Sequence, residues 1–421
     1  MNKSSYNNYV AILRSELLPA LGCTEPIAIA YCAAKARQTL GCMPDTISVA
    51  CSGNIIKNVK GVTVPNSGGL KGVEAAAVLG IIGGDADKEL EVLEHVSGRD
   101  IEETEAFLKT GKCTVSLQEG EENLYVMCTL KSGTDTASVE LKTKHNHISK
   151  IEKNGKVVFS QPDVVTEEAG NKKLLNLEEI YEFANCVKID DVKEIIDRQI
   201  QMNMAIAEEG VQNSWGVNVG AECLKMSGDD TLRRAEALAA AGSDARMSGC
   251  PMPVVINSGS GNQGITLTAP VVTYAKDLKA SEEKLIRAMV LANLISIHQK
   301  RFIGNLSAYC GATSAATAAA CGVAYLYDES MEVISNTIIN SIATIGGMVC
   351  DGAKPSCAAK IRSAVDTAML AYRLAKDGRV YQSGEGLVEK DAETTIRNVG
   401  RMGRVGMAST DVEILNIMIG Q

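Results

Sequence analysis

The chain has 421 residues, of which 45% are hydrophobic and 22% charged, so its length alone suggests two domains. Its 51 acidic residues exceed its 42 basic ones, and the net charge of −9 argues against a general affinity for nucleic acid. No apolar run reaches the roughly 18–20 residues that a membrane helix needs, and the N-terminus lacks the apolar core of a signal peptide. We therefore expect a cytoplasmic protein with no nucleic-acid or membrane partner.

The first segment with a clear pattern, residues 6–40, is predicted to be helical with an interruption at residues 22–26. Its second half is rich in alanine and closes at Gly41, a typical helix C-cap. Residues 45–170 differ, because short β-rich runs alternate there with Gly, Asn and charged turns. The runs expected to form strands are 46–51, 114–117, 124–130, 137–141 and 156–159, and the expected helices between them are 73–79 and 87–96.

From residue 171 onward, apolar residues recur at the three-to-four residue spacing of helices. Ser281 is a good helix start, because its hydroxyl can cap free amides and two glutamates follow it. The expected helices are 177–184, 192–209, 231–241, 281–299, 311–326, 332–346 and 357–376. We predict an α+β fold in which residues 1–44 and 171–421 form a mostly helical main domain, and residues 45–170 form a smaller inserted α+β domain.

Thirteen cysteines are many for a cytoplasmic protein, in which a disulfide framework is not expected. Cys23, Cys310 and Cys357 fall at predicted helix starts, where free amides and the helix dipole stabilise a thiolate, the form that binds iron. Cys350 lies across an Asp-Gly turn from Cys357, so both sulfurs converge if the turn folds back. Cys321 lies about 16 Å from Cys310 along a continuous helix, too far to share one cluster. A packed thiol is the alternative at each of these positions.

Glycine-rich loops are the second kind of candidate site. Residues 257–264 expose backbone amides that suit a carboxylate or a phosphate, or else form a plain turn without a ligand. They lack the ending of a P-loop and the spacing of a dinucleotide fingerprint. Residues 51–54 and 64–69 form similar Gly/Asn loops that could close over a substrate.

The histidines do not form a metal pattern. His145 and His147 alternate along a probable strand with Lys and Asn, which suits an exposed face. His298 ends an apolar helix and is expected to be a satisfied structural histidine. With four histidines in the chain, neither a zinc hydrolase nor a Ser-His-Asp enzyme is favoured.

Three motifs taken together resemble the L-cysteine desulfidase family, which is related to the α chain of iron–sulfur L-serine dehydratases. The motifs are LGCTEP at 21–26, NSGSGNQG at 257–264 and CDGAKPSC at 350–357, and the likeness runs over most of the chain. The resemblance implies a lyase with an oxygen-labile [4Fe–4S] cluster and no pyridoxal phosphate. It also implies a small amino-acid substrate that reaches an open iron.

The resemblance carries site residues with it. Cys310, Cys350 and Cys357 match the cluster ligands of the dehydratases. Cys23 falls where the dehydratases have a Ser/His-containing substrate loop, which leaves it as a base, a substrate contact or a fourth ligand. We take Cys23 as the first choice for the catalytic base, since a helix-start thiolate has a lowered pKa. The expected substrate contacts are Thr24, Asn54, Ser260, Asn262 and Gln263.

The implied reaction is β-elimination from L-cysteine to pyruvate, ammonia and hydrogen sulfide, or the same elimination from L-serine. A pyridoxal-phosphate lyase with a Schiff base at Lys354 is a competing interpretation. A non-catalytic iron–sulfur redox sensor and a helical scaffold whose cysteines merely pack are two others. A homodimer is a reasonable expectation for a chain of this size, although no motif indicates it.

Overall fold

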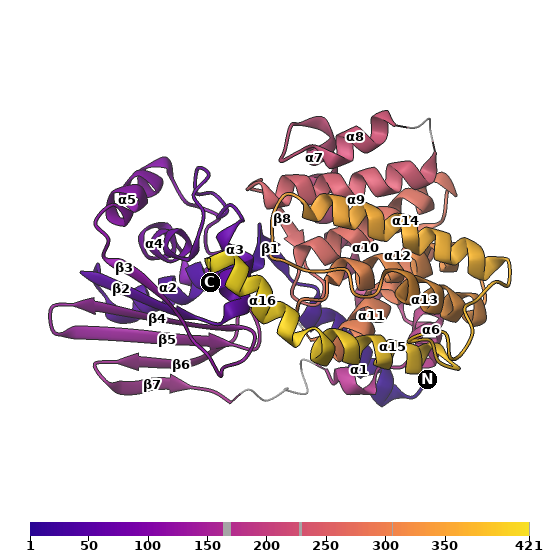
Figure 1. Cartoon of the computed structure of the whole chain (residues 1–421), viewed down its shortest axis with the longest axis horizontal. Coiled ribbons are helices and arrows are strands. Elements are labelled where there is room, and N and C mark those ends of the chain that lie inside the picture. Colours follow the sequence, from indigo (N-terminus) through magenta and orange to yellow (C-terminus); the bar gives the residue numbers. More distant parts are fainter. Residues whose placement is uncertain (163–169, 227–229, 305, 421) are drawn as a thin grey trace.

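The computed structural model describes the chain except for residues 163–169, 227–229, 305 and 421. The protein is a mostly helical α+β protein, as predicted, and its main sheet and most of its helices lie in two adjacent lobes (Figure 1). Within the described part of the chain, no helix is long and apolar enough to span a bilayer.

The helices and strands have the following bounds. The α-helices are α1 (Lys3–Glu16), α2 (Thr24–Leu40), α3 (Gly53–Lys60), α4 (Val73–Gly83), α5 (Gly98–Leu108), α6 (Leu177–Cys186), α7 (Ile189–Gln212), α8 (Val219–Lys225), α9 (Thr231–Met247), α10 (Gly261–Asp277), α11 (Glu282–Ile303), α12 (Gly311–Leu326), α13 (Met331–Ile345), α14 (Cys357–Lys376), α15 (Ala392–Arg401) and α16 (Ala408–Ile419). The strands are β1 (Pro19–Leu21), β2 (Thr46–Cys51), β3 (Cys113–Leu117), β4 (Tyr125–Ser132), β5 (Asp135–Lys142), β6 (Ile148–Lys153), β7 (Lys156–Ser160) and β8 (Pro253–Val255). The short helices are η1 (Ala86–Glu91), η3 (Lys172–Leu174) and η4 (Met402–Gly406).

The main sheet is mixed and has the strand order β3-β2-β4-β5-β6-β7. Strands β2 and β3 run parallel, and the other neighbours pair antiparallel, with Val49 opposite Cys128 in β2 and β4. The inward residues of these strands pack on α2, whose Ile27 and Ile29 are fully buried in the same apolar cluster. Helix α2 thus packs with the sheet, and the domain boundaries at 44/45 and 170/171 stay a prediction.

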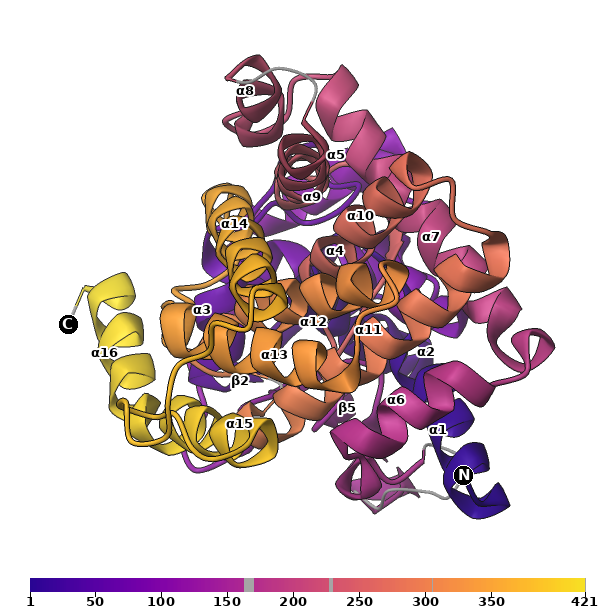
Figure 2. The same cartoon turned by 90° about the vertical axis from the view of Figure 1, so that its right-hand side faces the viewer.

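The helical lobe is built on small side chains. Figure 2 shows α10 and α12 near its centre, with α9, α11, α13 and α14 around them. A Cβ at Gly210 of α7 would lie 2.0 Å from the carbonyl oxygen of Ala241 in α9. A Cβ at Gly264 of α10 would lie 2.0 Å from the carbonyl oxygen of Val255. These backbones approach each other more closely than any larger side chain allows, which explains the many Ala and Gly residues in the second half of the chain.

Among the described residues, a strand pair and the C-terminal helix help to join the lobes. Strand β1 pairs antiparallel with β8, with Ala20 opposite Val254, and so ties the start of α2 to the helical lobe. The C-terminal helix α16 crosses to α3, where the buried amine of Lys57 forms an ion pair with Asp411 (Figure 1). The segments that carry the candidate residues meet between these two connections.

Several sequence expectations need correction. Residues 51–54 were expected to form a loop, but strand β2 ends at Cys51 and α3 already begins at Gly53. The expected helix 87–96 contains only the short 3₁₀ helix η1, followed by turns. Strand β6 and helix α5, which opens with a capping box at Ser97, were not expected.

Candidate functional site

A single backbone bridge brings Cys310 and Cys350 together. Tyr309 and Val349 pair antiparallel, and the amide of Cys310 donates to the carbonyl of Met348 at 2.9 Å. The amide of Cys350 donates to the carbonyl of Ala308 at 2.7 Å. Because both cysteines flank the same bridge, the start of α12 and the loop before α14 hold their thiols side by side.

The loop between Cys350 and Cys357 folds back, as the Asp-Gly turn predicts. Gly352 has a φ of 93°, a left-handed conformation that favours glycine, and a Cβ there would lie 2.4 Å from the carbonyl oxygen of Lys57. Cys357 begins α14, and its Sγ lies 3.8 Å from the carbonyl oxygen of Gly352. The loop thus packs against α3 and returns Cys357 toward Cys350.

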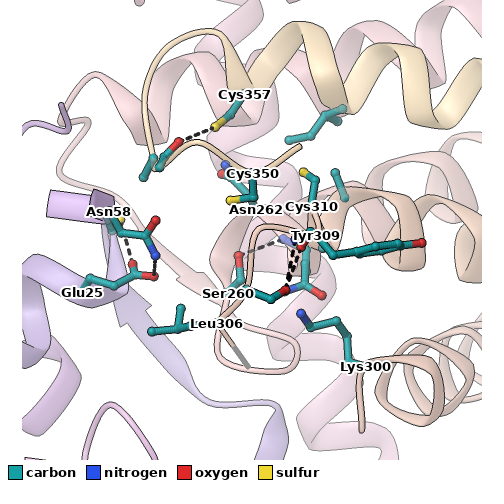
Figure 3. A pocket seen from close by; sticks show the side chains of 18 of the residues that line it. Glu25, Asn58, Ser260, Asn262, Lys300, Leu306, Tyr309, Cys310, Cys350 and Cys357 are labelled. Carbon is teal, nitrogen blue, oxygen red and sulfur yellow. Dashed lines mark hydrogen bonds between the residues drawn. The ribbon is translucent and has the colours of Figure 1, made fainter. Parts of the chain in front are cut away.

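Cys310, Cys350 and Cys357 line one cavity together with Cys23 (Figure 3). It encloses about 690 Å³ of empty space, including the part open to solvent. Cys23 is buried, and the other three thiols are half-buried. All thirteen cysteines of the chain are free thiols, and Cys321 is buried in the helical core away from this cavity. The four cysteines predicted as candidate site residues therefore line this cavity, whereas Cys321, which was excluded as a ligand, does not.

Burial disfavours the thiolate form of Cys310 and Cys357. Burial and, to a smaller extent, the nearby sulfur of Cys350 raise the pKa of Cys310 to about 12. Burial likewise raises the pKa of Cys357, again with Cys350 as a like charge. A thiolate is unfavourable at these positions unless a positive group binds the sulfurs.

Lysines surround the three thiols. Lys300 is buried, lines the cavity and has its pKa lowered to about 8 by burial, an effect that Cys350 and Cys310 oppose. Figure 3 shows its amine directed toward the cavity. Lys360 donates to the carbonyl of Val349 at 2.7 Å and pairs with Asp351. These cations suit a site that holds negative charge.

Three of the cysteines that line the cavity have the thiol chemistry that an iron–sulfur cluster requires. Among the residues that the structure describes, no three His, Cys, Asp or Glu side chains are grouped closely enough to hold one ion. The sulfurs of Cys310, Cys350 and Cys357 instead face a common space from separate segments, and a cluster spreads its thiolate ligands over several irons. The lysines around the thiols would offset the negative charge of such a group.

Cys23 departs from its expected state. It lies at the start of α2, as expected, where it is the N-cap residue, but burial and the charge of Glu25 raise its pKa well above the usual value. Its Sγ donates to the Oε2 of Glu25 at 3.1 Å. The expectation of a lowered pKa at this helix start is therefore wrong, because desolvation and an adjacent carboxylate outweigh the helix dipole.

Glu25 collects several donors at the cavity wall. Its Oε2 also accepts from the hydroxyl of Thr24 at 3.1 Å, and its Oε1 accepts from the Nδ2 of Asn58 at 3.0 Å (Figure 3). Burial alone would raise the pKa of Glu25, but the neighbouring His145, the hydrogen bond from Cys23 and the charge of Arg246 leave that pKa below its ordinary value. Glu25 is thus a buried carboxylate that stays ionised.

His145 lies next to this carboxylate, which sequence reasoning did not foresee. Its Nε2 is 4.0 Å from the Oε1 of Glu25, and the side chain is buried against Gly259. Burial lowers the pKa of His145, so the ring is neutral at neutral pH. The expected exposed strand face is wrong for His145, because the residue lies in the turn between β5 and β6. His298, in contrast, is buried with its Nε2 2.9 Å from Glu393, the structural role expected for it.

The Gly-rich loop reaches the same cavity. Ser260 caps α10 by accepting from the amide of Gln263 at 3.5 Å, and Ser260, Asn262 and Gln263 all line the cavity. Thr24 does not line it, and its hydroxyl donates to the carbonyl of Gly259 at 3.0 Å. Thr24 therefore joins the Gly-rich loop to the start of α2.

Asn54 lies elsewhere. It lines a neighbouring cavity formed with residues 117–123 and α16, which shares Ser307 with the cysteine cavity. Its expected substrate contact is not supported by this position.

Sequence reasoning missed Arg246, Lys300, Asn58 and Tyr309, which also line the cysteine cavity. Three of them lie inside or next to ordinary helices, where no motif marks them. Lys300 follows the apolar middle of α11, but it stands beside Arg301 in the basic last turn of the helix, so its burial could not be read from the sequence.

The chain belongs to the serine dehydratase alpha chain family, whose family model matches residues 87–416. Its curated relatives include a UPF0597 protein of Lachnoclostridium phytofermentans, 49% identical over 98% of this chain and 100% of the relative. A UPF0597 protein of Desulfitobacterium hafniense is 48% identical over 99% of this chain and 97% of the relative. Another, of Treponema denticola, is 45% identical over 100% of this chain and 99% of the relative.

Proposed function

We propose that this chain is an iron–sulfur-dependent, pyridoxal-phosphate-independent lyase that eliminates the β-substituent of L-cysteine. The products are pyruvate, ammonia and hydrogen sulfide, formed from one L-cysteine and one water. The observation that carries the proposal is the convergence of Cys310, Cys350 and Cys357 on one cavity in a member of the serine dehydratase alpha chain family. L-Serine, which would release water in place of hydrogen sulfide, is the alternative substrate that the family description supports.

In this proposal, Cys310, Cys350 and Cys357 would hold a [4Fe–4S] cluster. When bound, the cluster supplies a Lewis acid for the substrate carboxylate or for the leaving group. Lys300 and Lys360 offset its negative charge. The reducing conditions that keep thirteen free thiols intact agree with a cytoplasmic enzyme.

Cys23 and Glu25 are the groups that we assign to the Cα proton. Because Glu25 is ionised and accepts the hydrogen bond of the Cys23 thiol, it can take the thiol proton as Sγ takes the proton from Cα. The electron pair left on Cα forms the Cα–Cβ double bond, and sulfide leaves Cβ. The aminoacrylate that results hydrolyses to pyruvate and ammonia.

The Gly-rich loop positions the substrate in this proposal. Ser260, Asn262 and Gln263 supply polar side chains and the free amides of the first turn of α10, which suit an anionic group. Thr24 acts indirectly, by holding this loop against Glu25.

The pyridoxal-phosphate alternative has little support at Lys354. The amine of Lys354 donates to the carbonyls of Asp351 and Gly352, and this lysine does not line the cysteine cavity. A Schiff base there would form outside the space that the other candidate residues share.

The test is anaerobic reconstitution with iron and sulfide, followed by iron analysis and product assays. We expect about four irons per chain, with pyruvate and sulfide formed from L-cysteine faster than pyruvate from L-serine. The variants Cys310→Ser, Cys350→Ser and Cys357→Ser should each lose most of the iron and the activity. The buried control Cys321→Ala should keep both.

Faster turnover of L-serine would assign the chain to the dehydratase reaction. Iron without any product would make it a redox sensor, and no iron would leave the cysteines as packing residues. Full iron retention by the three serine variants would refute the ligand assignment.

A further inference from the structure

Arg246, near the end of α9, is a buried guanidinium that faces the cysteine cavity with unused donors. It is 2% exposed and lines the cavity. Its Nη1 donates to the Oδ1 of Asn262 at 3.1 Å, whereas its Nε and Nη2 are buried and find no acceptor among the described residues. Glu25 is near enough for its charge to interact with Arg246, but buried N–H donors that make no hydrogen bond are costly, so this position favours an anion that enters from the cavity and accepts from them.

The surroundings of Arg246 strengthen this argument. Gly261 is the first residue of α10, and a Cβ there would lie 2.4 Å from the Nε of Arg246. The guanidinium thus lies against the first turn of α10, where free amides give the helix its positive end. Two positive groups repel each other unless an anion lies between them. A guanidinium presents two parallel N–H groups that match a carboxylate.

The same cavity also offers acceptors for a positive group. Glu25 is a buried carboxylate on its wall. The Oδ1 of Asn58 and the Oε1 of Gln263 are buried and, within the described part of the chain, accept no hydrogen bond. An ammonium group needs acceptors of this kind, because it donates three hydrogen bonds. One cavity therefore presents unused donors and unused acceptors together.

We propose that Arg246 binds the α-carboxylate of the substrate, while Glu25 and Asn58 bind its α-ammonium group. This inference rests on the proposed function, and it defines the substrate class of that site as zwitterionic α-amino acids. The wall that carries Cys310 and Cys350 is then left for the substituent on Cβ.

The test uses ligands that cannot react. L-Alanine carries both charged groups but no leaving group, ethylamine lacks the carboxylate, and propionate lacks the amine. Calorimetric titrations are made anaerobically on the full chain, with and without reconstituted iron. Wild-type protein should bind L-alanine at least tenfold more tightly than either partial ligand, since each charged hydrogen bond contributes about 10- to 100-fold.

Arg246→Met should weaken L-alanine binding about 10- to 100-fold and abolish propionate binding, while ethylamine binding stays unchanged. Arg246→Lys keeps the positive charge but loses the two parallel N–H groups, so its loss of L-alanine affinity should be intermediate. The matched control is Arg362→Met, because Arg362 also contacts α9, through Glu236 at 3.1 Å, but does not line the cavity. It should bind L-alanine as the wild type does.

Undetectable L-alanine binding by wild-type protein, or equal affinity in wild type and both Arg246 variants, would overturn the inference. If Arg246→Met fails to fold, as judged by circular dichroism, Arg246→Lys decides alone. L-Alanine binding does not depend on turnover, so the two proposals fail separately. Selective binding without pyruvate formation would reject the lyase, whereas turnover without loss in the Arg246 variants would reject the carboxylate site.

Discussion

The thiol of Cys23 donates a hydrogen bond to the buried carboxylate of Glu25, with 3.1 Å between Sγ and Oε2. The two residues are neighbours in the first turn of α2, and both line the cavity that holds Cys310, Cys350 and Cys357. In the proposed mechanism, this contact lets a helix-start cysteine pass a proton to a carboxylate that stays ionised in spite of its burial.

This proton transfer predicts that Cys23 and Glu25 affect turnover but not iron content. Cys23→Ala and Glu25→Gln should each lower kcat for L-cysteine by about 100-fold or more, the usual contribution of a positioned general base, because either change removes the proton acceptor. Iron per chain after reconstitution should equal that of the wild type.

The control for this prediction is a second buried cysteine of the same helix. Cys32 donates to the carbonyl of Val139 at 3.2 Å and does not line the cavity. Cys32→Ala should cost about 1 kcal/mol of stability and leave kcat unchanged. Full turnover and full iron content in Cys23→Ala would show that another group is the base.

The ion pair between Lys57 and Asp411 links the C-terminal helix α16 to the loop that carries Cys350, so breaking this pair should affect both stability and iron binding. The amine of Lys57 is buried, pairs with Asp411 of α16 and donates to the carbonyl of Cys350 at 3.2 Å. Asp411→Asn should destabilise the protein by about 3 kcal/mol, because it leaves a buried ammonium without its counter-charge. Urea unfolding measures this loss, and the reconstituted variant should also release iron faster under a chelator.

The control is an ion pair of the same type on the surface. Lys284 pairs with Asp328, whose side chain is 82% exposed. Asp328→Asn should change stability by less than about 1 kcal/mol, as exposed pairs do. Similar losses in the two variants would mean that the burial of Lys57 has no special effect.

Local signals were enough to predict most of the helices. Ser281 caps α11 by accepting from the amide of Lys284, and Cys357 begins α14, as their sequences indicate. Helix α3 escaped prediction because it has eight residues and opens with Gly-Asn, a turn signal. Its stability comes from tertiary packing, since Ile55 and Val59 are fully buried. The pairing of β1 with β8 joins segments more than 200 residues apart, which no local pattern predicts.

The candidate site was predictable where residue type carries the chemistry. Cys310, Cys350 and Cys357 stand out as cysteines at turns and helix starts. Arg246 did not, because it lies in an alanine-rich helix and its unused donors follow only from tertiary packing. The pKa of Cys23 was predicted in the wrong direction for the same reason, since burial and the charge of Glu25 are not visible in the sequence.

We expect the conformation of the loop between Cys350 and Cys357 to require glycine at position 352. Gly352→Ala combines a strained φ of 93° with a Cβ only 2.4 Å from the carbonyl of Lys57, so the loop must shift. We expect the variant to lose most of its iron after reconstitution. The control Gly378→Ala has a φ of 70° but meets no atom within 4 Å, so it should lose stability without losing iron. Equal iron content in both variants would argue against the loop as a ligand scaffold.

Asp244 predicts a pH-dependent loss of stability. Burial raises its pKa from 3.8 to about 6, against the hydrogen bonds from the backbone amides of Gly220 and Val219. Because the folded pKa exceeds the unfolded one, the contribution of Asp244 is fully present below about pH 4 and is lost as the pH rises through about 6. The loss is at most about 3 kcal/mol, at 1.36 kcal/mol per pKa unit.

Asp244→Asn removes this titration and keeps an oxygen for the amide of Gly220, which donates to Asp244 at 3.0 Å. Relative to the wild type, its free energy of unfolding should therefore be about 2 kcal/mol higher at pH 7.5 than at pH 4.5. Urea unfolding at both pH values measures the difference. Asp197→Asn, at a half-exposed ion pair with Lys193, controls for the removal of a carboxylate elsewhere. A gain at pH 4.5 as large as that at pH 7.5 would show that Asp244 is not the titrating group.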